Sequence, residues 1–158
     1  MKIAFIYTSK TGNTEELVKI LHKLFRKQAS TVDLYRITDF PLGQLSKYDA
    51  IVVGTYTWGD GELPPEMEPL YEAFESVNRK QIITGVVGTG DRFYPNFCGA
   101  VDAFRDMLYV HTDLTVTLKV ELRPQTIDLN RCKRFVELFM KKCHAQYRNG
   151  SESCVNAR

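Results

Sequence analysis

Five stretches of the chain are short, apolar and rich in β-branched or aromatic residues, a pattern that predicts strands. They are Lys2–Tyr7, Thr31–Ile37, Ala50–Tyr56, Gln81–Gly88 and Leu114–Leu122. The third and fourth are nearly continuous apolar runs, as expected of strands buried on both faces of a parallel sheet. Thr31–Ile37 alternates between apolar and polar residues, which favours a place at the edge of the sheet.

Between these stretches the apolar residues recur with the spacing of amphipathic helices. In Leu17–Phe25 the apolar side chains at 17, 20, 21, 24 and 25 share one face. The same spacing predicts three further helices, Glu66 to about Val77, Cys98–Leu108 and Asp128 to about Ala145, with Asp128 as a candidate cap. Between the second and third strands, Pro41–Leu45 indicates a loop with at most a short helical turn in place of a full helix.

The alternation of strand and helix, repeated five times along the chain, predicts an α/β protein. Strands separated by helices imply parallel pairing with right-handed crossovers. We therefore expect a doubly wound five-stranded parallel sheet with helices on both faces. A chain of 158 residues fits one domain, residues 1–145, followed by a polar tail, residues 146–158.

Composition and charge narrow the class of protein. Hydrophobic residues make up 44% and charged residues 25%, which is ordinary for a soluble globular domain. No apolar run approaches the ~20 residues of a membrane span, and no signal-peptide pattern opens the chain, so we expect a cytoplasmic protein without membrane contact. The four cysteines and three histidines lack metal-ligand spacing, so no metal site is predicted.

The net charge of +2 is unevenly distributed along the chain. Six acidic residues and no basic one lie between Asp60 and Glu75, whereas basic residues are concentrated in the first and last predicted helices. These runs are either solvated helix faces or the two ends of a dipolar molecule that turns one end toward its partners. Without a recognition motif or interleaved aromatic residues, the basic residues do not predict nucleic-acid binding.

Candidate chemistry lies in Thr8–Thr14, the loop between the first strand and the first helix. Five of its seven side chains carry a hydroxyl or an amide, and Gly12 permits a tight turn. Backbone amides at a helix N-terminus, together with such side chains, can hold a phosphate dianion. The simpler alternative is a helix cap, which needs only one hydroxyl.

Two further loops are expected at the same, carboxyl edge of the sheet. Thr57–Pro65 contains the single tryptophan, Trp58, and Gly88–Phe97 contains three aromatic residues. Aromatic side chains in glycine-rich loops either cap the ends of the sheet or stack on a ligand. Beside a phosphate loop they predict a flat, phosphorylated, aromatic ligand. The G-K-[ST] ending of nucleotide hydrolases and the G-x-G-x-x-G fingerprint are both absent.

Three ordered motifs, Thr8–Thr14, Thr57–Asp60 and Gly90–Gly99, resemble those of the flavodoxins. The resemblance extends from Met1 to about Lys142, without the insertion that long-chain members carry in their last strand. It implies strand order 2-1-3-4-5 and non-covalently bound FMN. It also implies a monomeric, low-potential one-electron carrier, not an enzyme, that shuttles electrons between a flavodoxin reductase and acceptor proteins.

The resemblance also implies a role for individual residues. Side chains of the Thr8–Thr14 loop and its backbone amides would bind the FMN phosphate, while Trp58 and Tyr94 would stack on opposite faces of the flavin. The peptide of Gly59 would turn its carbonyl toward protonated flavin N5, and the amides of Asp91 and Cys98 would contact the pyrimidine edge. The full set of cofactor-binding residues is Thr8, Ser9, Lys10, Thr11, Gly12, Asn13, Thr14, Thr55, Tyr56, Thr57, Trp58, Gly59, Thr89, Gly90, Asp91, Tyr94, Asn96, Phe97 and Cys98.

Several residues depart from the usual pattern of the family. The isoelectric point is about 8.3, whereas flavodoxins are usually acidic. Arg92 and Phe93 follow Asp91 where small residues are usual, and we expect Arg92 to offset part of the negative field around reduced flavin. Lys10 either assists the phosphate or points into solvent. Alternative functions on the same scaffold are an NAD(P)H:quinone oxidoreductase and a flavodoxin-like activator of ribonucleotide reductase. A phospho-receiver domain is disfavoured because the acidic cluster and acceptor aspartate are missing.

Overall fold

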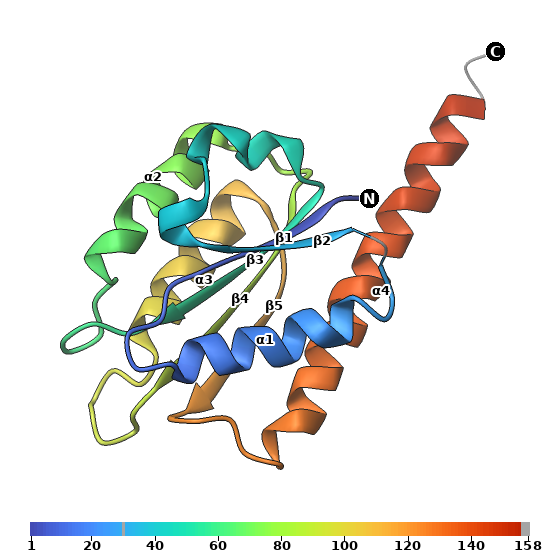
Figure 1. Ribbon diagram of the computed structural model, residues 1–158. Helices are drawn as coiled ribbons and strands as arrows, with labels where there is room; N and C mark the ends of the chain where they lie inside the picture. Colours follow the sequence, from blue (N-terminus) through green and yellow to red (C-terminus); the bar gives the residue numbers. More distant parts are fainter. Residues whose placement is uncertain (30, 156–158) are drawn as a thin grey trace.

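The computed structural model describes the backbone of residues 1–29 and 31–155, and the side chains of residues 1–29 and 31–150. Five strands alternate with four α-helices in this part of the chain (Figure 1). Their bounds are β1 Ile3–Tyr7, α1 Asn13–Phe25, β2 Val32–Arg36, β3 Ala50–Tyr56, α2 Glu68–Val77, β4 Ile83–Gly90, α3 Gly99–His111, β5 Asp113–Glu121 and α4 Asp128–Val155.

All five strands are parallel and form one sheet in the order β2-β1-β3-β4-β5. The predicted fold class and strand order are therefore confirmed, as is the edge position of β2. β1 pairs with β2 on one side and with β3 on the other, where Ile3 faces Val32 and Ala50 respectively. The chain thus reverses its direction of travel across the sheet at β1, and such a switch point opens a crevice at the carboxyl ends of the strands.

Two layers of helices cover the sheet, α1 and α4 on one face and α2 and α3 on the other (Figure 1). Under α1 and α4 lies a cluster of buried aromatic rings, in which Phe25 contacts Phe5 and Phe139 edge to face. The opposite core contains Phe74 and Phe104 from α2 and α3. The apolar spacing read from the sequence therefore marks the faces that the helices bury.

The connection from β2 to β3 differs from the repeated strand–helix pattern. Residues 37–49 form no α-helix, only two 3₁₀ segments, Ile37–Asp39 and Leu42–Lys47. Pro41 and Gly43 disfavour a continuous helix here. Buried Leu45 and Tyr48 still cover the sheet. The expectation of five strand–helix units was wrong at this point, whereas the loop with a short helical turn was correct.

The last helix is longer than its apolar pattern predicts. α4 does not end near Ala145 but continues to Val155, and its last turns extend beyond the sheet (Figure 1). The side-chain amide of Gln146 donates a hydrogen bond to the Gln81 carbonyl at 2.8 Å, which ties the first turn of the extension to the body. Residues 156–158 of the predicted tail lie outside the described residues, and the division of the chain at residue 145 stays a prediction.

Cys132 and Cys143 of α4 are both buried in the aromatic core, where they pack as small apolar side chains. The Asp128 carboxylate accepts the backbone N–H of Gln125 at 2.9 Å, so this residue caps α4 from within its first turn.

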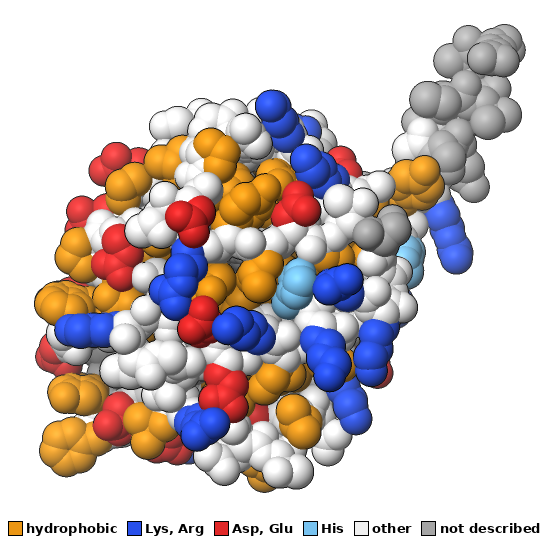
Figure 2. Space-filling model, in the orientation of Figure 1, with side chains coloured by type: hydrophobic (Ala, Val, Ile, Leu, Met, Phe, Trp, Pro, Cys, Tyr) orange, Lys and Arg blue, Asp and Glu red, His pale blue; other side chains and the backbone are white. Residues whose placement is uncertain are grey.

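The charges divide between the two helical layers. Basic side chains gather over α1 and α4 in the view of Figure 2. The acidic run Asp60–Glu75 belongs to the loop after β3 and to α2, on the other face of the sheet. Within the described residues, no helix is long and apolar enough to cross a membrane, and no group of three or more His, Cys, Asp or Glu residues could hold a metal ion.

Candidate cofactor-binding site

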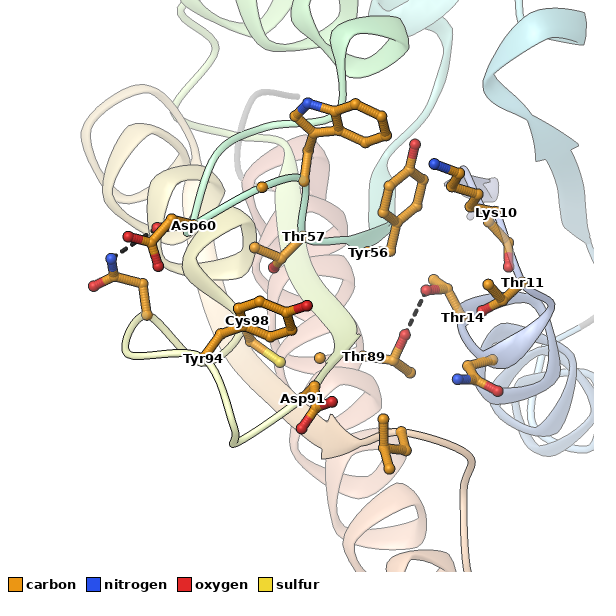
Figure 3. A pocket seen from close by; sticks show the side chains of 17 residues that line it. Lys10, Thr11, Thr14, Tyr56, Thr57, Asp60, Thr89, Asp91, Tyr94 and Cys98 are labelled. Carbon is orange, nitrogen blue, oxygen red and sulfur yellow. Dashed lines mark hydrogen bonds between the residues drawn. The ribbon is translucent and has the colours of Figure 1, made fainter.

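A cavity of about 650 Å³ opens at the carboxyl edge of the sheet (Figure 3). Its walls come from the loops after β1, β3 and β4, as the sequence predicted, with one further residue that directly follows β5. The lining residues are Ser9, Lys10, Thr11, Asn13, Thr14, Tyr56, Thr57, Trp58, Gly59, Asp60, Thr89, Gly90, Asp91, Tyr94, Asn96, Cys98 and Leu122.

The loop after β1 brings hydroxyl groups and the N-terminus of α1 to the cavity. Gly12 has a φ of 95°, a left-handed conformation that lets the chain turn directly into the helix. The Ser9 hydroxyl oxygen accepts the backbone N–H groups of Gly12 and Glu15, both at 3.2 Å, and so fixes the loop on the helix. Asn13 and Thr14 open the first turn, where backbone N–H groups have no intrahelical acceptor.

The hydroxyls of Thr14 and Thr89 are 2.7 Å apart and buried, which joins the first turn of α1 to the end of β4 (Figure 3). This contact fixes one wall of the cavity against another across the sheet. Because Thr14 is 1% exposed, its hydroxyl is oriented by the fold itself.

The loop that carries Trp58 is closed on itself. Trp58 and Glu62 exchange backbone hydrogen bonds of 2.9 and 2.8 Å, and Gly59 and Gly61 between them have φ values of 51° and 115°. A side chain at Gly61 would also collide with Asn96, since its Cβ would lie 2.6 Å from that of Asn96. The turn leaves the indole of Trp58 41% exposed at the mouth of the cavity.

The loop after β4 is hydrogen-bonded to this turn. The Asn96 side-chain amide donates to the Asp60 carbonyl at 2.7 Å (Figure 3). Tyr94 lines the cavity and is 52% exposed. Cys98 ends the loop beneath it, and burial raises the pKa of its thiol to about 12, so the thiol stays protonated and unreactive at neutral pH.

Glu66 lies just before α2 and links this segment to the loop after β1 and to the end of β3, although it does not line the cavity. One of its carboxylate oxygens accepts the hydroxyls of Thr8 at 2.7 Å and Tyr56 at 2.8 Å. Partial burial alone would raise the pKa of Glu66, but hydrogen bonds from Thr8, its own backbone and Tyr56, and the charge of Lys10, hold it below the usual value. Burial and the Glu66 carboxylate in turn raise the pKa of Tyr56 to about 12, so its hydroxyl remains a donor.

Most residues predicted for the site lie around the cavity, and four do not. Thr8 turns to Glu66, Gly12 shapes the turn, Thr55 is buried and donates to the Tyr56 carbonyl, and Phe97 packs into the core behind the loop. The predicted set lacks two residues that line the cavity: Asp60, and Leu122, which reaches it with a φ of 52°. Sequence reasoning also missed the linking role of Glu66, for which the only signal was its place in the acidic run.

The two cations singled out in the sequence lie in different surroundings. The Lys10 ammonium is 4.3 Å from the centroid of the Trp58 ring, an arrangement that neither of its two expected roles included. Arg92 lies over Phe97 and 3.6 Å from the Glu121 carboxylate, so part of its charge is already opposed. Its expected effect on reduced flavin stays a prediction.

Together, the switch-point cavity, the hydroxyl-rich loop at a helix N-terminus and the two exposed aromatic side chains define a class. They belong to α/β proteins that hold a flat, phosphorylated aromatic cofactor at the carboxyl edge of a parallel sheet.

The chain belongs to the flavodoxin family, whose model, described as "Flavodoxin", matches residues 5–112. It is 36% identical over 145 residues to probable flavodoxin 1 of Bacillus subtilis (strain 168), covering 88% of this chain and 90% of that protein. The solved structure of a Streptococcus pneumoniae TIGR4 flavodoxin superimposes with a TM-score of 0.84 at 35% identity, covering 90% of this chain and 99% of the other. Oxidised flavodoxin 1 of Bacillus cereus gives 0.82 at 34% identity, covering 89% and 98%.

Flavodoxins bind FMN and exchange electrons with redox partner proteins. As a member of this family, the chain therefore has FMN as its cofactor and electron transfer as its activity. The residues present fit that cofactor. Hydroxyl groups and first-turn amides suit a phosphate dianion, the aromatic pair suits a planar ring, and the cavity volume lies in the range of sites that bury ligands of this size.

Proposed function

We propose that the chain is a low-potential one-electron carrier that receives electrons from a reductase and delivers them to acceptor proteins. FMN supplies the redox chemistry, while the protein supplies binding, orientation and electrostatics. The observation that carries the proposal is the set of carboxylates at the aromatic-walled cavity. Asp60 and Asp91 line it, Glu62 adjoins it, and none of the three takes part in an ion pair within the described residues.

These carboxylates lower the reduction potential of the bound ring. Adding negative charge to a ring beside fixed negative charges is unfavourable, so reduction requires a stronger donor. One unit charge ~8 Å away contributes about 2 kcal/mol at an effective dielectric of about 20. The positive charge of Lys10 has the opposite effect on the potential, because it favours the negatively charged, reduced ring.

We assign the binding roles by where the side chains lie. The Thr8–Thr14 loop would hold the phosphate through Ser9, Thr11, Asn13 and Thr14, and Trp58 and Tyr94 would flank the ring. Gly59, already at positive φ, can turn its peptide at little steric cost and so offer either its N–H or a carbonyl to the ring edge.

Transfer would take place at the rim of the cavity. Phe93 is 87% exposed beside Tyr94, and the acidic run Asp60–Glu75 lies along the neighbouring loop and helix. An exposed aromatic side chain with an acidic surround fits the small, transient interfaces of redox encounters, here with basic partner surfaces. A cytoplasmic location and a monomeric state stay predictions.

Titration of the FMN-free protein with FMN tests the binding half of this proposal. We expect one FMN per chain, with quenched flavin fluorescence. Riboflavin, which lacks the phosphate, is the matched ligand and should bind at least tenfold more weakly because the Thr8–Thr14 loop then holds nothing. No binding of FMN, or equal binding of both ligands, would contradict the assigned site.

Redox titration and a coupled assay test the carrier half. We expect two separate one-electron steps, the second at the lower potential, and electron delivery to a protein acceptor only when a reductase is added. Sustained oxidation of NADPH by a quinone without a reductase would instead favour the oxidoreductase alternative.

A further inference from the structure

Lys10 and Trp58 make a contact that joins two walls of the cavity. Lys10 belongs to the loop after β1 and Trp58 to the loop after β3, and both line the cavity. The ammonium nitrogen lies 4.3 Å from the centroid of the indole ring, well within the range of a cation–π interaction. In Figure 3 the Lys10 side chain reaches from its own loop toward the side of the cavity formed by Tyr56.

Lys10 differs from the other cations near the site in how its charge is balanced. Arg92 faces Glu121, Arg123 faces Glu16 and Lys119 faces Asp102 in ion pairs. Within the described residues, Lys10 takes part in no ion pair and is the one basic residue that lines the cavity. Its positive charge helps to lower the pKa of Glu66, but the Glu66 carboxylate already accepts hydrogen bonds from Thr8 and Tyr56.

Trp58 needs such a contact to keep a fixed orientation. Its backbone is fixed by the hydrogen bonds to Glu62, but its side chain stands 41% exposed on a two-glycine turn. An exposed aromatic side chain can adopt several rotamers. A cation on the ring favours one of them by about two- to fivefold.

We propose that Lys10 is a positioning residue for Trp58. The Lys10 ammonium holds the indole at the cavity and brings positive charge to the reduced, anionic flavin. The second part rests on the proposed function, whereas the first concerns the protein alone. Since Trp58 is the only tryptophan of the chain, its fluorescence reports on this contact without ambiguity.

The first measurement uses the FMN-free protein. Lys10→Ala should raise the acrylamide quenching constant of Trp58 about twofold, because the ring loses the cation that covers it. Lys10→Arg, which keeps a cation, should restore the original value, and Arg92→Ala should not change it. Equal quenching in Lys10→Ala and the unmodified protein would overturn the positioning role, whether or not the protein binds FMN.

The second measurement compares binding and redox potentials. In Lys10→Ala we expect the Kd of oxidised FMN to rise two- to fivefold, and that of fully reduced FMN to rise by a further three- to tenfold. Oxidised FMN and its neutral one-electron-reduced form both lack the negative charge on the ring, so their Kd values should rise equally. The further rise for fully reduced FMN then falls on the second one-electron step, whose potential drops by about 28 to 59 mV, since a tenfold ratio corresponds to 59 mV for one electron. Arg92→Ala should shift it less, because Glu121 opposes that charge.

Two results would overturn the electrostatic part of the proposal. One is tighter binding of oxidised FMN by Lys10→Ala, which would mean that the ammonium competes with the flavin for the indole. The other is an unchanged second potential in Lys10→Ala, or a larger shift in Arg92→Ala than in Lys10→Ala. Failure of every variant and of the unmodified protein to bind FMN would instead refute the proposed function, while the quenching measurement still decides the positioning role.

Discussion

The core beneath α1 and α4 and the loops at the carboxyl edge of the sheet are built on opposite principles. In the core, Phe25, Phe135 and Phe139 are almost fully buried and contact one another at ring-centroid distances of 5.2 to 6.4 Å. At the edge, Trp58, Phe93 and Tyr94 are exposed, and several residues have a left-handed backbone conformation. Of the six residues that have a positive φ in the described part of the chain, five lie there, namely Gly12, Gly59, Gly61, Cys98 and Leu122.

The difference teaches where stability and binding reside in this molecule. Burial of apolar rings supplies the free energy of folding, whereas exposed rings and left-handed turns contribute little to it or oppose it. The core therefore compensates for an edge whose groups are held ready for a ligand. Variants in the two regions should separate the free energy of unfolding from the affinity for FMN.

The largest effect on stability is expected in the core. Phe139→Ala should lower the free energy of unfolding of the FMN-free protein by about 3–5 kcal/mol, because it removes a ring and leaves a cavity. Denaturant unfolding measures this loss, with Phe139→Leu as the milder control. The Kd of FMN for the folded fraction should not change. A Kd that rises in proportion to the lost stability would show that the core and the binding loops are not independent.

Trp58→Ala should have the converse effect. The loss of one stacking ring should weaken FMN binding by about 1.5–3 kcal/mol, roughly ten- to a hundredfold in Kd. The free energy of unfolding should stay within about 0.5 kcal/mol, since the indole is exposed. Calorimetric titration and denaturant unfolding give the two numbers, and Trp58→Phe should recover most of the affinity. A large loss of stability would place Trp58 with the core.

Glu66 sharpens the comparison because it belongs to the edge yet should contribute to stability. Since its folded pKa lies below the usual value, its stabilisation is complete above the usual pKa and is lost as the pH falls through the folded one. At pH 7, Glu66→Gln should cost about 1 kcal/mol through weaker hydrogen bonds from Thr8 and Tyr56. Below about pH 4 the difference from the unmodified protein should shrink.

Unfolding curves of the unmodified protein and of Glu66→Gln between pH 3 and 7 measure this difference. The exposed neighbour Glu68→Gln serves as the control and should show no comparable convergence. A Glu66→Gln penalty that stays constant with pH would mean that the charge of Glu66 does not matter.

The smallest effect is expected at the amino edge of the sheet. Lys142 on α4 is paired with Asp113 on β5 at 3.0 Å, but both side chains are about one third or more exposed. Lys142→Ala should change the free energy of unfolding by less than about 0.5 kcal/mol and leave FMN binding unchanged. Lys141→Ala is the matched control. A loss above 1 kcal/mol would show that this edge also holds the fold together.

The same division explains what the sequence predicted. Strands and helices follow from apolar spacing that the core requires, so Ala50–Tyr56 was predicted to the residue. The cavity loops were found because hydroxyls, glycines and Trp58 are unusual residues to follow buried strands. Pairs of residues distant in sequence were not predictable. Lys10 meets Trp58, and Glu66 meets Thr8, only once the sheet has formed.

Two errors have local causes. The β2–β3 connection keeps the buried apolar residues of a helix, but Pro41 and Gly43 restrict it to 3₁₀ turns. α4 was ended too early because its apolar stripe stops at Cys143, where the helix leaves the core. A polar segment can continue a helix that is already nucleated, and periodicity gives no sign of this.

The long final helix has a practical consequence. α4 runs opposite to the strands, so its last turns lie at the end of the molecule away from the cavity (Figure 1). The twelve residues from His144 to Val155 add about 18 Å of helix. A reporter domain, an affinity handle or an electrode linker joined to this end would leave the cofactor mouth open. The protein can therefore be wired or immobilised in a defined orientation without altering the loops that carry its chemistry.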